Sequence, residues 1–285
     1  IKSNIFSKNN RLFTIINIII FKYCGFGMFE FNKIYKVIIN HTMQMTHIKI
    51  TLPDGSVKDF PKGATGAEIA KTIGKRLAED AVAAKVNGNL KDLDAPINED
   101  ADFQVVTLND PDGLNCLRHS LAHLLAAAVM EIWPDTKRTI GPAIENGFYF
   151  DFEFSKPITE KDLPKIEAKM HEILPKWDRF ERHDLGAAEA KKEYPHNQFK
   201  HELIEEFSQG GKKVSFYKSG DYWDLCRGGH LSSMKKIRHD SFKLTKLAGA
   251  YWRGNEKNPM LTRIYAIAFP TKKELDEYLK QKEEA

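Results

Sequence analysis

The chain contains 285 residues, of which 42% are hydrophobic and 29% are charged, values typical of a globular protein with room for two domains. Its net charge of +4 is unevenly distributed, because residues 1–45 hold six basic and one acidic residue, whereas residues 46–285 hold 37 basic and 38 acidic residues. Bulk charge therefore gives no argument for nucleic-acid binding by residues 46–285, where only local basic patches could serve. Three scattered cysteines, Cys24, Cys116 and Cys226, argue against a disulfide framework and for a reducing compartment, the cytoplasm.

Residues 1–45 differ in composition from the rest of the chain. About two-thirds of them are Ile, Lys, Asn, Phe or Tyr, and Ala, Asp and Pro are absent. The apolar run at 12–21 is shorter than the roughly 20 residues that cross a bilayer, and no small-x-small cleavage site follows it. We expect this segment to be disordered or non-native, with Met43 or Met45 as the natural start.

A small β-grasp module is predicted over residues 46–109. Residues 47–52 alternate as a strand does, residues 53–55 (Pro-Asp-Gly) form a turn, and residues 56–60 return as a second strand. A helix is expected over 65–77, capped by Thr65 or Gly66. Its apolar stripe consists of Ile69, Ala70, Ile73 and Leu77. Strands at 81–86 and 102–108 complete the module.

An α+β domain is predicted over residues 114–285, after a loop at 109–113. Helices are expected at 114–132, 163–174, 186–192 and 197–207, and a final charged helix is capped by Thr271. The alternating residues 148–154 predict a strand, and further strands are expected around 214–218, 241–246 and 262–269. This order is typical of helices packed on a largely antiparallel sheet.

Two short motifs concentrate the reactive side chains of the chain. They are His119-x-x-x-His123 and Cys226-x-x-x-His230. In each motif the two reactive residues are four positions apart, the spacing of one helical turn. The four groups could converge on a metal ion, for which zinc is the natural choice, or on a water poised to attack an ester. Two glycines between Cys226 and His230 allow a tight turn. Spacing alone does not choose between a zinc site and a metal-free acid–base pocket, and the helical histidines could also be core residues.

Several ordered motifs resemble the second N-terminal domain of bacterial threonyl-tRNA synthetases. They are Arg118-His-Ser-Leu-Ala-His123, Ile140-Gly-Pro142 with Gly147-Phe-Tyr149, Asp224-Leu-Cys-Arg-Gly-Gly-His230 and Ala248-Gly-Ala-Tyr-Trp-Arg-Gly254. The β-grasp module is similar to the first domain of that family, of the TGS type, with Leu52-Pro-Asp-Gly55 as its hairpin. One departure from the family pattern is Gly229, where many bacterial members carry Pro.

The resemblance implies proofreading of tRNA. Serine differs from threonine by one methyl group, and such a difference gives only about 1–3 kcal/mol of discrimination. The family therefore hydrolyses seryl-tRNA(Thr) at a site on its second domain. By match to the family motifs, the implied catalytic residues are His119, His123, Lys200, Asp224, Cys226 and His230. A histidine would act as acid or base, Lys200 would stabilise negative charge, and Asp224 would bind the serine ammonium or orient a histidine. Solvated surface charge is the alternative for Lys200 and Asp224.

Residues 251–253 are the expected tRNA contacts. Tyr251 and Trp252 could stack on the terminal adenosine, with Arg253 near phosphate. Tyr251 and Trp252 could equally be core residues.

The resemblance also implies partners and cofactors. The expected partner is the acceptor end of tRNA(Thr), with no role for DNA or a membrane. Full-length members are homodimers through a class II core that uses ATP and a core zinc ion, and no segment of this chain offers that core. The chain alone is therefore expected to be an aminoacyl-tRNA ester hydrolase with no certain cofactor. Whether the His/Cys group binds zinc is left open by the sequence. The alternatives are a non-catalytic tRNA-binding module and a purely structural zinc site.

Overall fold

A computed structural model describes residues 47–284 of the chain. The expectation for residues 1–45 lies outside these described residues. Within the described part, no helix combines the length and the apolar character needed to cross a membrane.

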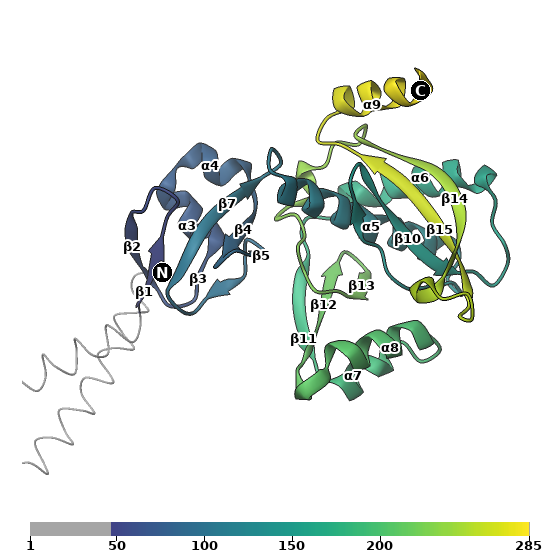
Figure 1. Cartoon of the computed structure of the whole chain (residues 1–285), viewed down its shortest axis with the longest axis horizontal. Helices are drawn as coiled ribbons and strands as arrows, with labels where there is room; N and C mark the ends of the chain where they lie inside the picture. Colours follow the sequence, from purple (N-terminus) through teal and green to yellow (C-terminus); the bar gives the residue numbers. More distant parts are fainter. Residues whose placement is uncertain (1–46, 285) are drawn as a thin grey trace, which may run out of the picture. The chain divides into compact units, whose positions relative to one another are not determined.

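A β-grasp sheet forms the first domain (Figure 1). Its strands are β1 (His47–Thr51), β2 (Val57–Pro61), β4 (Ala81–Val86), β5 (Asn89–Lys91) and β7 (Ala101–Thr107), in the order β2-β1-β7-β4-β5. Strand β1 runs parallel to β7, with Ile50 opposite Ala101, whereas β4 is antiparallel to both of its neighbours. Two short strands, β3 (Ala64–Thr65) and β6 (Pro96–Ile97), form a separate pair.

The expected helix at 65–77 is wrong as a single element. It divides into α3 (Gly66–Ile73) and α4 (Lys75–Asp80), because Gly74 between them has an extended backbone with φ 179° and ψ 144°. Thr65 caps α3 in a capping box with Glu68, as expected. The break also shortens the apolar stripe: Ile69 and Ala70 are fully buried, but Ile73 is 37% exposed.

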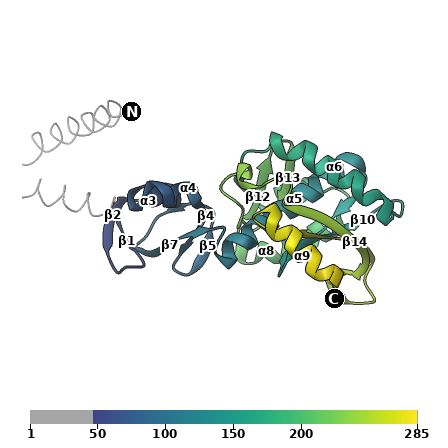
Figure 2. The ribbon, with the colours of Figure 1, turned by 90° about the horizontal axis from the view of Figure 1, so that it is seen from above.

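Two helices cover one face of the main sheet in the second domain. The sheet has the order β14-β15-β10-β8 and is antiparallel throughout, which confirms the α+β prediction. Its strands are β8 (Lys137–Arg138), β10 (Gly147–Glu153), β14 (Phe242–Tyr251) and β15 (Met260–Ala268), with β9 (Ala143–Ile144) paired to β10. The helices α5 (Pro111–Ile132) and α6 (Leu163–Ile173) pack side by side against this sheet (Figures 1 and 2). Helix α5 begins three residues earlier than expected, with Pro111 in its first turn.

A second, smaller layer lies beside the main sheet. The strands β11 (Glu181–Leu185), β12 (Val214–Ser219) and β13 (Tyr222–Leu225) form an antiparallel sheet in which β12 and β13 are a hairpin. Helices α7 (Ala187–Lys192) and α8 (Gln198–Phe207) pack with this sheet around a separate apolar cluster. The pattern did not predict β11 or β13. Helix α9 (Lys272–Glu284) is capped by Thr271, as expected. Short 3-10 turns occupy Glu160–Asp162, Leu174–Lys176, Gln209–Gly211, Met234–Lys236 and Trp252–Gly254.

Candidate active site

Helix α5 supplies two of the four reactive groups. Fourteen of its residues are buried, so an imidazole on this helix faces the interior of the domain. His123 is buried and His119 is half-buried, and their ring centroids lie 4.8 Å apart. His230 joins them, with its ring 4.9 Å from His119 and 5.0 Å from His123. The structure thus brings the two sequence motifs together.

The loop after β13 supplies the other two groups. Cys226 follows the last residue of β13, and the chain from Cys226 to His230 is irregular, so the helical spacing of this pair does not reflect a helix. Gly228 and Gly229 have φ values of 96° and 86°, a region that glycine adopts without strain. The turn brings the Cys226 Sγ to 3.3 Å from the Nε2 of His230 and to 3.0 Å from the Nε2 of His119.

The four groups fit the donor set of a metal ion. One ligand atom each from His119, His123, Cys226 and His230 can be chosen so that all four lie within 4.8 Å of one another. Both ring nitrogens of His123 and the Nδ1 of His230 are buried without a hydrogen-bond partner among residues 47–284. Zinc takes His and Cys ligands tetrahedrally at about 2.0–2.3 Å. The group could therefore hold zinc after the four side chains draw slightly closer together.

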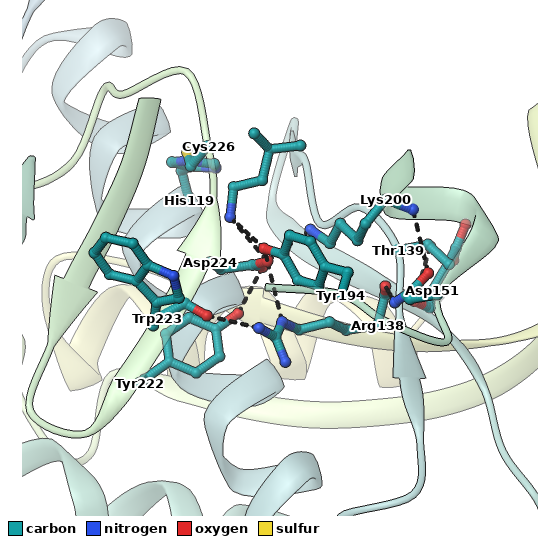
Figure 3. A network of polar contacts seen from close by, with 12 residues as sticks. His119, Arg138, Thr139, Asp151, Tyr194, Lys200, Tyr222, Trp223, Asp224 and Cys226 are labelled. Atoms are coloured by element: carbon teal, nitrogen blue, oxygen red, sulfur yellow. Dashed lines mark hydrogen bonds and ion pairs between the residues drawn. The ribbon is translucent and has the colours of Figure 1, made fainter. Parts of the chain in front are cut away.

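A buried cluster of charges lies beside the His/Cys group (Figure 3). The Lys200 Nζ lies 2.8 Å from the Asp224 Oδ1, and the Arg138 Nε lies 3.0 Å from the same oxygen. The hydroxyl groups of Tyr194 and Tyr222 donate to the two carboxylate oxygens at 2.6 and 2.8 Å. Because Lys200 is 2% and Asp224 1% exposed, the alternative that they are solvated surface charges is wrong.

Helix α8 positions the lysine of this cluster. Asn197 caps the helix by accepting a hydrogen bond from the Lys200 backbone N–H, and its amide donates to the Arg138 carbonyl oxygen at 2.8 Å. The Arg138 guanidinium in turn donates to the Trp223 carbonyl oxygen at 2.6 Å. The side chain of Asn197 therefore ties α8 to β8, and that of Arg138 ties β8 to β13.

Burial and the two cations set the protonation of the cluster. Burial raises the pKa of Asp224, but Lys200 and Arg138 outweigh it, so the pKa of that carboxyl lies well below its ordinary value. Burial lowers the pKa of Lys200, and Asp224 opposes that effect. Two cations around one carboxylate leave a net positive charge. With its oxygens occupied by these donors, Asp224 is better suited to anchoring Lys200 and Arg138 than to binding an ammonium group.

The histidines of α5 are held in their neutral form. Burial lowers the pKa of His119, and a hydrogen bond to the backbone of Gly141, which raises the pKa, only partly offsets this effect. Burial lowers the pKa of His123 further, and the neighbouring His119 and His230 add to this effect. Neutral imidazoles can accept a proton at neutral pH.

A pocket of about 290 Å³ connects the His/Cys group with the charge cluster. Its polar lining includes His119, His123, Lys200, Asp224 and Cys226. Its apolar lining consists of Ile140, Pro142, Phe150, Leu203, Phe207 and Leu225. The volume lies just below the roughly 300–1,000 Å³ that is typical of small-ligand sites.

Residues 251–253 lie elsewhere. Trp252 is buried in the apolar cluster of the smaller layer, and its Nε1 donates to Glu202 at 2.7 Å, which confirms the core alternative for this residue. Tyr251 is 40% exposed, and Arg253 pairs with Glu202 and Glu206 on α8. Within the described part of the chain, none of the three lines the pocket.

Three site residues were missed from the sequence. Arg138, Tyr194 and Tyr222 all contact the Asp224 carboxylate, yet none belongs to the motifs described in the sequence. One signal was available for Arg138, which stands two residues before the motif at Ile140. Tyr194 gave no local signal, because its carboxylate partner lies 30 residues away. Tyr222 lies two residues before Asp224 on β13, a spacing that places both side chains on one face of a strand, but β13 was not predicted.

Comparisons with known proteins place this architecture among the aminoacyl-tRNA synthetases. The TGS domain matches residues 48–107, and the threonyl and alanyl tRNA synthetase second additional domain matches residues 214–265. The second match includes Asp224, Cys226 and His230.

The relatives narrow this class to one family. The chain is 47% identical over 236 residues to a threonine–tRNA ligase of Rubrobacter xylanophilus, covering 83% of this chain and 36% of the relative. It is 48% identical over 241 residues to the enzyme of Thermotoga petrophila, covering 84% and 37% respectively. For Deinococcus radiodurans the identity is 47% over 244 residues, covering 83% and 37%. The chain belongs to the threonyl-tRNA synthetase family and spans little more than a third of the length of these relatives.

Proposed function

We propose that this chain proofreads tRNA(Thr) by hydrolysing the ester of seryl-tRNA(Thr). The observation that carries the proposal is the pocket lined by both His119 and the Lys200–Asp224 ion pair, with Arg138 bound to Asp224 behind the lining. Ester hydrolysis needs a base for water and a positive charge near the developing oxyanion, and the pocket offers both.

His119 is the proposed general base. Its hydrogen bond to the Gly141 backbone engages one ring nitrogen, and the Nε2 faces the Cys226 Sγ at the pocket. The Nε2 takes a proton from water as the water oxygen attacks the ester carbonyl carbon. The carbonyl π electrons move to oxygen, whose negative charge lies in the field of Lys200 and Arg138.

Collapse of the tetrahedral intermediate completes the reaction. The carbonyl re-forms and the bond from carbon to the ribose oxygen breaks. The His119 imidazolium returns its proton to that oxygen, which leaves free serine and uncharged tRNA(Thr). Cys226 and His230 orient His119 in this scheme, and Tyr251 and Arg253 are proposed to contact the RNA outside the pocket.

Zinc at the His/Cys group is a second candidate, favoured by the buried ring nitrogens of His123 and His230 that have no hydrogen-bond partner among residues 47–284. His119, His123, Cys226 and His230 would hold it, and zinc can lower the pKa of a bound water to about 7. Metal analysis of the purified protein tests this. One zinc per chain in the wild type, lost in Cys226→Ala, would support the site, and a metal-free wild type after exposure to zinc would exclude it.

Deacylation of mischarged tRNA tests the proposed function. The 285-residue chain should release serine from seryl-tRNA(Thr) well above the rate without protein, and should act more slowly on threonyl-tRNA(Thr). His119→Ala should lower kcat by about 10²–10⁴-fold, the usual contribution of a general base. His196→Ala is the matched control, since His196 is exposed and does not line the pocket. Binding of seryl-tRNA(Thr) without cleavage would instead support the non-catalytic tRNA-binding module.

A further inference from the structure

The carboxylate of Asp92, which follows β5 of the β-grasp domain, contacts the loop that carries Cys226 and His230. The Asp92 Oδ1 accepts hydrogen bonds from the backbone N–H groups of Gly229 and His230, both at 3.0 Å. The Oδ2 accepts a hydrogen bond from the Tyr217 hydroxyl at 2.6 Å. Three donors from the second domain thus converge on one carboxylate from the first.

The backbone of the loop is shaped for an anion at this position. Positive φ values at Gly228 and Gly229 turn successive N–H groups toward one side, an arrangement that binds negative charge. A Cβ atom on Gly228 would lie 2.7 Å from the Tyr217 Oη and 3.2 Å from the Asp92 Oδ2. The loop is therefore packed directly against its anchor.

Tyr217 remains a donor to this carboxylate. A phenolic hydroxyl can donate one hydrogen bond, and that of Tyr217 lies 2.6 Å from the Asp92 Oδ2. Tyr217 lies on β12, and its ring centroid is 4.3 Å from that of His230. The same side chain thus touches both the anchor and the catalytic loop.

The residues after His230 are hydrogen-bonded to the β-grasp domain and to helix α5. Ser232 donates from its backbone N–H to the Val82 carbonyl oxygen at 2.9 Å and from its hydroxyl to the Ala81 carbonyl oxygen at 3.1 Å. The Leu231 N–H donates to the Ser120 hydroxyl of α5 at 3.0 Å. The loop is held between β4 of the β-grasp sheet and the helix that carries His119.

We propose that Asp92 is a positioning residue for the ester hydrolysis, and that the β-grasp domain is thereby a structural part of the hydrolytic site. Asp92 does not line the pocket and touches no reacting atom. Its carboxylate fixes the backbone at residues 229 and 230, which sets the imidazole of His230 and the thiol of Cys226 against His119. This inference rests on the proposed function.

The variant Asp92→Asn tests the inference, because it keeps the shape of the side chain and removes its charge and one acceptor. Asp94→Asn is the matched control, since Asp94 is exposed and pairs only loosely with Arg179, at 3.8 Å. We expect Asp92→Asn to lower kcat for seryl-tRNA(Thr) by about 10-fold with KM changed by less than about 2-fold, as loss of positioning requires. Asp94→Asn should leave both constants unchanged.

Alkylation of Cys226 by iodoacetamide gives a second readout that needs no tRNA. Peptide mass spectrometry separates this thiol from the other cysteines. Release of the loop should raise the alkylation rate of Cys226 several-fold in Asp92→Asn and leave it unchanged in Asp94→Asn. If the wild type does not cleave seryl-tRNA(Thr), the proposed function fails, but this rate still tests whether Asp92 positions the loop.

Two results would overturn the inference. One is a folded Asp92→Asn protein with wild-type kcat and wild-type Cys226 alkylation, which would make Asp92 only a tie between domains. The other is an unchanged kcat and alkylation rate in Tyr217→Phe, the variant to use if Asp92→Asn does not fold. Tyr217→Phe removes only the donor to the Oδ2, so it should shift both readouts in the same direction by a smaller factor.

Discussion

Lys200 and Asp224 form an ion pair of 2.8 Å that is almost completely withdrawn from solvent. Charged groups are costly to bury, and a buried pair is weak evidence for stability in itself. Here both residues of the pair line a pocket that His119 and Cys226 also line. Clustered, strongly perturbed ionisable groups in a cleft are characteristic of functional sites.

Removal of the lysine should unbalance this cluster. In Lys200→Met the Asp224 carboxylate keeps only Arg138 as a cation, so we expect the free energy of unfolding to fall by about 2–4 kcal/mol. Deacylation should fall as well, because the positive charge near the oxyanion is reduced. Urea unfolding measures the first effect. Combining Lys200→Met with Asp224→Asn should cost less than the sum of the two single changes, and simple additivity would contradict a coupled pair.

Stability should depend on pH through His123. Its pKa in the folded protein lies well below its ordinary value of 6.5, so below pH 6.5 the unfolded chain binds a proton that the folded chain does not. The folded state is therefore penalised as the pH falls, by up to about 1.4 kcal/mol per pH unit until the folded pKa is reached. Urea midpoints at about pH 7.5 and about pH 5.5, with EDTA present, should differ less in His123→Leu than in the wild type. Equal differences in the two proteins would contradict the assignment.

Gly141 is a position where no side chain fits. A Cβ atom there would lie 2.1 Å from the Cδ2 of Phe150, a buried ring that also lines the pocket. We expect Gly141→Ala to cost about 1–3 kcal/mol by overpacking and to reduce deacylation. Gly74→Ala is the control, because a Cβ atom at Gly74 meets nothing within 4 Å and its backbone is extended. Thermal unfolding that ranks the two variants in the opposite order would refute the packing argument.

Replacement of Arg263 by lysine should destabilise the folded protein. Its guanidinium binds Asp151 through two hydrogen bonds of 2.7 and 2.8 Å and lies 3.7 Å from the centroid of the Tyr149 ring. Lysine cannot reproduce the paired geometry, and Asp151 is buried, so we expect Arg263→Lys to cost about 1–3 kcal/mol. Arg238→Lys alters an exposed pair with Asp240 at 3.2 Å and should change stability by less than about 0.5 kcal/mol. Urea unfolding of both variants checks this, and similar losses would contradict it.

Local patterns predicted most of the elements. The alternation at 148–154 and the apolar stripe of α6 show which faces of these elements are buried. The Ala/Leu-rich composition of α5 agrees with its burial on most sides. The pattern failed at Gly74, where an apolar period continues across a break in the backbone, and at β11 and β13. Strand β11 is exposed along most of its length, so its residues carry no alternating signal.

The sequence by itself determined that His119 and His123 share a helical face, that glycines follow Cys226, and to which family the motifs point. Only the tertiary structure decided that these groups meet and that Arg138, Tyr194 and Tyr222 surround Asp224. It also decided that Asp92 binds the backbone of His230, which lies 138 residues further along the chain. The physical reason is that periodicity records whether a side chain is buried, but not which distant group it contacts. Those contacts are fixed only when the sheets and helices pack.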